Sequence, residues 1–314
     1  MISIADVRRA RSVIRNEIYR TPIVRNETLD ERLGGEVFFK LENLQKTGAF
    51  KIRGVLNRMN ALSAVEREKG IICASSGSFG FAVAYVSRRR GLKATIVLPE
   101  CTPGYKIERI GHYAPVVVEG ATYHESSLIA RRKAKEEELT FLHPFDDSFI
   151  MAGQGTVGLE ILEDVTGIDI LIAPIGGGGL IAGLLTVFKE LSPETVVVGI
   201  EAQGAACMYE SWKQGRIVEL PHVDTIAEGI AVKKPGHLTF EVVRKHGDDI
   251  VLVPDGEIRD AVRFLFEDVK VVAECAAAAP LAALLSGKVN ARGKKTVCVV
   301  SGGNIAPEQL AALL

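Results

Sequence analysis

The chain has 314 residues, of which 47% are hydrophobic, so it is long enough to bury one large core or two closely packed smaller ones. Its 38 basic and 39 acidic residues give a net charge of −1, which excludes the basic surface expected of a protein that binds nucleic acid or an anionic membrane. The most apolar stretch, near residues 170–187, is interrupted by glycines and falls short of the roughly 20 apolar residues that cross a bilayer.

Short β-branched runs alternate with helical patterns along the chain. The first 18 residues carry charges every few positions, which predicts an amphipathic helix and not a secretion signal. Strands are predicted at 71–74, 94–98, 116–118, 170–173, 195–200, 250–253 and 296–300. Helices are predicted at 80–90, 123–138, 152–166, 180–191, 257–269 and 276–285. Because the strand runs are apolar on both faces, the pattern indicates an α/β protein with mostly parallel sheets flanked by helices.

The cysteines indicate the compartment. They are odd in number, widely scattered and never form a CxxC pair: Cys73, Cys101, Cys207, Cys275 and Cys298. This usage predicts reduced thiols in the cytoplasm and argues against a disulfide or zinc framework.

Glycine-rich turns follow three of the predicted strands, as SSGSFG at 75–80, GGGG at 176–179 and SGGN at 301–304. Ligands of parallel sheets bind at the carboxyl ends of strands, where the free N–H groups that open a helix attract anions. No GxxxxGK[ST] motif is present, nor a GxGxxG motif with an acidic residue about twenty positions on, which disfavours a nucleotide. The tetraglycine is therefore either a phosphate loop or a tight structural turn.

Lys51 is the candidate catalytic residue. It lies in LENLQKTGAFKIRG, after a small-residue turn and at the start of a helical run. A lysine amine in a partly dry site has a lowered pKa and can react with the aldehyde of a cofactor. By this criterion alone Lys46 and Arg53 qualify as well, and a surface role for Lys51 stays open.

Seven motifs taken in order carry a resemblance: KTGAFKIRG, SSGSFG, HPFDD, GQGT, PIGGGGLIAG, EGIAVKKPG and VVSGGN. Together they resemble the fold type II enzymes that depend on pyridoxal phosphate (PLP), and threonine/serine dehydratases above all. Serine racemase and hydroxyaspartate ammonia-lyase are similar too. The likeness runs from Thr21 to the SGGN motif, and it implies the tryptophan synthase β-like fold. It also implies a large PLP-binding domain at 1–53 and 146–314 and a small mobile domain at 54–145.

The resemblance implies roles for individual residues. Lys51 matches the lysine that binds PLP covalently and later moves the Cα proton, and Phe50 would pack near the ring. Ser301 matches the residue that faces the pyridine nitrogen. Glu274 matches a carboxylate near the cofactor, although a glutamate at a helix start is commonly a dipole partner. The phosphate would bind to the main-chain amides of Gly176, Gly177, Gly178 and Gly179.

The first turn departs from the SSGNHG usual in dehydratases. Ser75, Ser76 and Gly77 keep the amide-rich wall that holds the substrate carboxylate, and Ser76 matches the residue that protonates the opposite face of Cα in serine racemase. Ser78 replaces an asparagine, and its hydroxyl is expected to reach the phenolic oxygen of PLP directly or through a water. Phe79 replaces a histidine and adds apolar surface beside the substrate. Neutral drift is the alternative reading of both changes.

Ser301 favours elimination, because a hydroxyl cannot hold the pyridine ring protonated as a carboxylate can. The predicted activity is therefore dehydration and deamination of L-threonine or L-serine to 2-oxobutanoate or pyruvate and ammonia. Racemisation of serine, elimination from another β-substituted amino acid such as 3-hydroxyaspartate, and binding of PLP or an amino acid without turnover are the alternatives.

Further expectations concern metals and partners. Relatives hold a divalent or monovalent cation at positions that look like Glu201, Ala205 and Cys207. A cation is left open, but the thiol of Cys207 disfavours magnesium and calcium, and no residue is assigned as a metal ligand. The resemblance implies a homodimer or higher homo-oligomer and a small amino-acid substrate.

Overall fold

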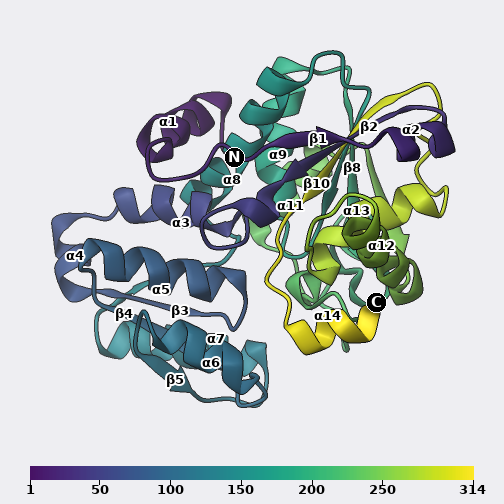
Figure 1. The fold of residues 1–314 in the computed structure, drawn as a ribbon. Helices are drawn as coiled ribbons and strands as arrows, with labels where there is room; N and C mark the ends of the chain where they lie inside the picture. Colours follow the sequence, from purple (N-terminus) through teal and green to yellow (C-terminus); the bar gives the residue numbers. More distant parts are fainter.

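The computed structural model describes residues 1–314, which form two β-sheets surrounded by helices (Figure 1). The strands are β1 (Ile23–Arg25), β2 (Glu36–Leu41), β3 (Ile71–Ala74), β4 (Ala94–Leu98), β5 (Val116–Val118), β6 (Thr140–Phe141), β7 (Ile170–Pro174), β8 (Val196–Ala202), β9 (Asp249–Val253) and β10 (Lys295–Val300).

The helices are α1 (Ile4–Ile14), α2 (Glu27–Leu33), α3 (Lys51–Asn60), α4 (Ala64–Lys69), α5 (Ser78–Arg90), α6 (Gly104–Gly111), α7 (Tyr123–Glu136), α8 (Ser148–Asp164), α9 (Gly179–Leu191), α10 (Cys207–Gln214), α11 (His237–His246), α12 (Asp255–Glu267), α13 (Cys275–Leu285) and α14 (Pro307–Leu313). None of them is both long and apolar enough to span a membrane.

The larger sheet has six strands in the order β1-β2-β10-β7-β8-β9. All neighbours are parallel except β1 and β2, which pair antiparallel with Ile23 opposite Lys40. The smaller sheet is fully parallel, in the order β5-β4-β3-β6, and lies with its helices to the lower left of Figure 1. The parallel arrangement predicted from the apolar runs is confirmed.

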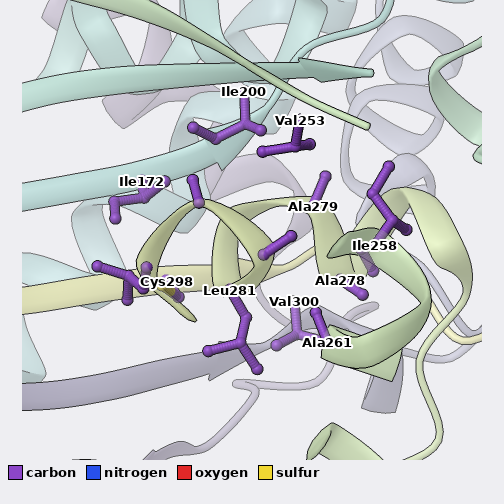
Figure 2. Close-up of a cluster of buried hydrophobic side chains, with 14 of the residues drawn as sticks. Ile172, Ile200, Val253, Ile258, Ala261, Ala278, Ala279, Leu281, Cys298 and Val300 are labelled. Carbon is purple, nitrogen blue, oxygen red and sulfur yellow. The ribbon is translucent and has the colours of Figure 1, made fainter. Parts of the chain in front are cut away.

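Helices cover both faces of the larger sheet, as the apolar strands require. Helices α8 and α9 pack on one face, and α12 and α13 pack on the other. Figure 2 shows Ala279 of α13 on the side of Ile200 and Val253 of the sheet, and Ala278 on the side of Ile258 and Ala261 of α12. The small alanine side chains of α13 bring its backbone close to the strands, which is how an uninterrupted apolar helix is accommodated inside the molecule.

Helix α3, which begins at Lys51, crosses α8 at a point where both helices carry glycine. A Cβ atom added to Gly153 would lie 2.6 Å from the carbonyl oxygen of Arg53, and one added to Gly54 would lie 2.6 Å from Nε2 of Gln154. Since both distances are shorter than any van der Waals contact, neither position accepts a side chain unless the helices separate.

Four charged side chains are buried beside this crossing. The Arg53 guanidinium, fully buried, donates hydrogen bonds of 2.7–2.8 Å to Glu42 and of 2.7 Å to Glu160. Lys40, also fully buried, donates to Glu160 at 2.7 Å. A buried charge is tolerated when it is paired and hydrogen-bonded, so the two cations and two carboxylates compensate one another and connect β2, α3 and α8.

The seven predicted strands are all present, with ends that differ by at most two residues. Strands β1, β2 and β6 were not predicted. Strand β2 begins with Glu36 and contains Lys40, and β1 and β6 have only three and two residues, so none of them is an apolar run. The six predicted helices are also present, and α8 begins four residues early because the Asp147 side chain caps it by accepting hydrogen bonds from Phe149 and Ile150. The domain division stays a prediction, and its first boundary, at 53/54, falls inside α3.

Replacing Arg53 tests the buried charge network. Arg53→Met keeps a long side chain but leaves the buried carboxylates of Glu42 and Glu160 without their main partner. The free energy of unfolding in urea should fall by about 3–5 kcal/mol. The matched control is Arg132→Met, whose side chain is 59% exposed, and it should change the same quantity by less than about 0.5 kcal/mol. Equal effects of the two substitutions would contradict the role given to the network.

Candidate active site

One cavity of about 250 Å³ is lined by the turns that follow β3, β7 and β10 and by the start of α3. The three glycine-rich turns, far apart in sequence, therefore meet at one place, as predicted. Every residue that the sequence proposed for the site lines this cavity: Phe50, Lys51, Ser75, Ser76, Gly77, Ser78, Phe79, Gly176, Gly177, Gly178, Gly179, Glu274 and Ser301.

Lys51 is the first residue of α3, and its Nζ lies 4.9 Å from the centre of the Phe50 ring. The backbone N–H of Phe50 donates to the carbonyl oxygen of Ser301 at 3.1 Å, which joins the lysine segment to the end of β10. Burial lowers the pKa of Lys51 to about 8, and the negative charge of Glu274 opposes this shift. An amine with this pKa is uncharged in a useful fraction near neutral pH and can react with an aldehyde.

The tetraglycine turn presents bare backbone to the cavity. Gly178 has a φ of 92°, which favours glycine, and the amides of Gly177, Gly178, Gly179 and Leu180 have no hydrogen-bond acceptor within the chain. A Cβ on Gly177 would lie 2.3 Å from the Phe145 ring. Free amides at the start of α9 and a wall too close for side chains form a cradle suited to a phosphate.

The serine turn forms the opposite wall. Gly77 precedes α5 without a capping side chain, and a Cβ there would meet no atom within 4 Å, so its backbone faces open space. Ser75 and Ser76 are half-buried in the cavity wall. Phe79 lines the cavity but is only 2% exposed and belongs to the core beneath the small sheet. Its ring therefore contributes to packing as well as to the wall.

Glu274 precedes α13 and faces the cavity, and its carboxylate does not cap that helix. Burial raises the pKa of Glu274 to about 7, while the backbone N–H of Asn304 and the charge of Lys51 act in the opposite direction. Ser301 is 3% exposed at the end of β10. The cavity therefore contains the Glu274 carboxyl group, which can carry a proton near neutral pH, and the buried hydroxyl group of Ser301.

The sequence did not single out several residues that line the cavity. Phe145, within HPFDD, supports the tetraglycine turn, and Asn304, within SGGN, donates to the side chain of Ser78. Lys106 and Glu228 form an ion pair of 2.5 Å at the cavity wall, and Arg109 lies 4.0 Å from the centre of the Phe81 ring. Three of the quoted motifs contained such residues, namely Phe145, Glu228 and Asn304. Lys106 and Arg109 lie in α6, where no sequence pattern indicated a site.

Glu201, at the position expected to hold a cation in relatives, has protein partners. Its carboxylate accepts hydrogen bonds from the backbone N–H groups of Met208 at 2.9 Å and Tyr209 at 2.7 Å, and the Cys207 sulfur lies 3.8 Å away. Burial raises the pKa of Glu201 to about 8 despite these bonds. In this structure the Glu201 carboxylate accepts hydrogen bonds from backbone N–H groups at the start of α10, and the Cys207 thiol lies next to it.

The chemistry of the cavity fits PLP. The cofactor needs an amine for its aldehyde, an anion site for its phosphate and polar groups for its ring substituents. Lys51 provides the amine, the tetraglycine cradle provides amides for the phosphate, and Ser301 and Ser78 provide hydroxyl groups. A Cβ on Gly177 or Gly178 would fill this cradle, at 2.3 Å from Phe145 and 2.6 Å from Met208, so the space depends on the glycines.

Residues 14–302 match the family described as pyridoxal-phosphate dependent enzyme, and the chain belongs to this family. It is 43% identical over 306 residues to an L-threonine ammonia-lyase of Thermotoga maritima, a match that covers 97% of this chain and 76% of the relative. It is 41% identical over 310 residues to a catabolic L-threonine dehydratase of Staphylococcus aureus, covering 97% and 90%. Its fold is similar to that of maize serine racemase, with a TM-score of 0.94, 36% identity and coverage of 99% and 96%. The predicted family and fold class are confirmed.

Adding a methyl group to the cradle tests the phosphate site. Gly177→Ala places a Cβ against the Phe145 ring and should weaken PLP binding by more than about tenfold, because the loop must move away from the phosphate. Equilibrium dialysis measures the Kd. Gly256→Ala, where a Cβ meets no atom within 4 Å, is the matched control and should leave the Kd unchanged. Unaltered binding by Gly177→Ala would show that the phosphate lies elsewhere.

The lowered pKa of Lys51 predicts how cofactor uptake depends on pH. Only the uncharged amine reacts with the aldehyde, so the rate at which apoenzyme takes up PLP should rise with pH and reach half its maximum near pH 8. Stopped-flow absorbance of the lysine-bound cofactor measures this rate. A midpoint near the model-compound value, about 10.4, would contradict the effect of burial.

Proposed function

We propose that this protein is an ammonia-lyase that converts L-threonine or L-serine to a 2-oxo acid and ammonia. One observation carries the proposal: a lysine whose pKa is lowered to about 8 shares a cavity with two amide-rich turns. One turn suits a phosphate and the other an amino-acid carboxylate. The two relatives at 41–43% identity are named as an L-threonine ammonia-lyase and an L-threonine dehydratase, which supports L-threonine as a substrate.

Bound PLP supplies an electron-withdrawing ring that acidifies the hydrogen on the substrate Cα. The turn from Ser75 to Gly77 would hold the substrate carboxylate and orient Cα toward Lys51. Its free backbone donor is the Ser76 N–H, because the Ser75 N–H donates to the Val97 carbonyl and the Gly77 N–H to Ser75 Oγ. The Lys51 amine then accepts the Cα proton, since its pKa lies close to the working pH. The β-hydroxyl then leaves as water, with a proton supplied near the cofactor phosphate, and hydrolysis of the released enamine gives the 2-oxo acid and ammonia.

Ser301 favours elimination over reactions that need a long-lived carbanion. A hydroxyl donates to the pyridine nitrogen but does not keep it protonated, so the ring is a weaker electron sink than one that faces a carboxylate. Prompt departure of the β-hydroxyl suits such a ring. Glu274, whose pKa is raised to about 7, is the carboxyl group of the cavity that could hold a further proton.

An assay of 2-oxo acid formation tests the proposed reaction. The wild-type enzyme should produce 2-oxobutanoate from L-threonine or pyruvate from L-serine, and Lys51→Ala should lower kcat by at least about a thousandfold and lose the visible absorption of the lysine-bound cofactor. Lys46→Ala, five residues earlier in the same segment, is the matched control and should keep both. The absence of 2-oxo acid with either substrate would reject the activity.

A substrate with a second carboxylate, such as 3-hydroxyaspartate, is the second candidate. Arg109 lines the cavity and stacks on Phe81, whereas the neighbouring Lys106 is neutralised by Glu228. Partial burial lowers the pKa of Arg109, but its guanidinium stays charged at neutral pH. It is thus a cation of the cavity that a second carboxylate could pair with.

This candidate is tested by substrate preference. Arg109→Gln should lower kcat/KM for 3-hydroxyaspartate by about tenfold and change the value for threonine by less than about twofold. Equal changes with both substrates would reject a role for Arg109 in selection. Chiral chromatography of the serine incubations checks racemisation, in which Ser76 would serve as the second proton carrier, and the absence of D-serine would exclude it.

Further proposals concern the cellular location of the enzyme, its oligomeric state and the movement of its small domain. We propose a cytoplasmic location, supported by five cysteines without a disulfide. We also propose a homodimer or higher homo-oligomer, as the family resemblance implies. We also propose that residues 54–145 move to close over the substrate. The Lys106–Glu228 ion pair, between α6 and the loop that leads to α11, is a contact that such a movement would alter. Cation binding at Glu201 is left open, and the neighbouring Cys207 thiol disfavours magnesium and calcium there.

A further inference from the structure

Ser78 stands where the turn that this sequence resembles carries asparagine. In the structure it is the first residue of α5, and its Oγ accepts a hydrogen bond of 2.9 Å from Nδ2 of Asn304. Asn304 lies after β10, 226 residues further along the chain. The same Nδ2 donates a second bond of 2.9 Å to the carbonyl oxygen of Thr47, in the turn that precedes Lys51.

These two bonds fix the direction of the Ser78 hydroxyl. The Thr47 carbonyl can only accept, so the amide nitrogen of Asn304, and not its oxygen, must face it. Both hydrogens of that nitrogen are then used. Since Ser78 Oγ is an acceptor toward Asn304, its own hydrogen is free to be donated, and Ser78 lines the cavity that contains Lys51.

We propose that Asn304 positions the Ser78 hydroxyl as the hydrogen-bond donor to the phenolic oxygen of PLP. That oxygen is carried by the ring carbon next to the one that bears the aldehyde, so it must lie beside the Lys51 nitrogen. The phosphate arm leaves from the ring carbon on the other side of the aldehyde, toward the tetraglycine. Ser78 belongs to the turn after β3 and not to the tetraglycine turn that would hold the phosphate, so its hydroxyl would serve the phenolic oxygen on the other side of the aldehyde.

The proposal accounts for the shorter side chain at position 78. A serine hydroxyl can rotate freely and reaches less far than an asparagine amide, so it needs a partner that sets its orientation. Asn304 provides that orientation and holds the Lys51 turn with the same nitrogen. The same Asn304 amide therefore holds both the Ser78 hydroxyl and the turn that precedes Lys51. A hydrogen bond from this hydroxyl to the ionised phenolic oxygen would be charge-assisted, and such bonds are stronger than those between neutral groups.

The test compares Ser78→Ala, Asn304→Ala and the double variant in their PLP complexes. Each single variant should weaken PLP binding by about tenfold or more and shift the visible absorption of the lysine-bound cofactor in the same direction. The double variant should have the spectrum of Ser78→Ala and a loss of affinity well below the product of the two single losses, because both changes remove the Asn304–Ser78 bond and only the Asn304–Thr47 bond adds to it. Ser78→Thr keeps the hydroxyl and should keep the wild-type spectrum.

Ser87→Ala is the matched control, since Ser87 is a buried serine of the same helix whose hydroxyl has no partner, and it should change neither the spectrum nor the Kd. A wild-type spectrum and Kd in Ser78→Ala would overturn the proposal. So would a double variant whose loss equals the product of the single losses, because Asn304 would then act through Thr47 alone. The proposal rests on PLP binding at Lys51 and not on the substrate, so spectra and binding decide it even if threonine is not consumed.

Discussion

The position of Lys51, the proposed catalytic residue, depends on charges buried two residues further along the same helix. Arg53 points away from the cavity into a fully enclosed group with Glu42, Glu160 and Lys40, while Lys51 opens into the cavity. Such a group contributes little net stability against apolar residues of equal size, but its directional bonds allow only one placement of α3. The burial that lowers the pKa of Lys51 therefore depends on contacts that α3 makes on its side away from the cavity.

The cavity joins parts of the chain that share no local structure. Its walls come from the ends of β3, β7 and β10, and the contacts that connect them are backbone bonds or single side chains. The bond from Phe50 to Ser301 and the bonds from Asn304 to Thr47 and Ser78 join the ends of β3 and β10 to the segment that leads into α3. The Asn304–Ser78 bond connects the end of a large-sheet strand to the turn after a small-sheet strand, so the complete cavity requires both sheets.

The sequence predicted the architecture and the position of the site from two kinds of signal. Apolar runs such as 170–173 indicate buried parallel strands because helices cover both faces of such strands. Glycine turns after strands indicate where anions bind. Strand β2 escaped prediction because its polar residue Lys40 is buried by pairing with Glu160, a partner 120 residues away. No local pattern encodes such a pair.

The same reason limits prediction of the site. Lys51, Ser301 and the tetraglycine were found through their motifs, whereas Arg109 and Lys106 lie on α6, which brings them to the cavity only through the packing of the small sheet. The part played by Phe145 also required coordinates, since its ring closes the space above Gly177 from a separate segment. Three-dimensional contacts of this kind leave no periodicity in the sequence.

The crossing of α3 and α8 at Gly54 and Gly153 has a mechanical consequence. With backbone atoms in direct contact, the two helices have less than the width of a methyl group in which to shift. The apolar face of α3 beyond Gly54 also packs in the core of the small sheet. The crossing therefore resists sliding of α3 along α8, so the amine at the first residue of α3 keeps its place relative to α8 if the rest of the small domain moves.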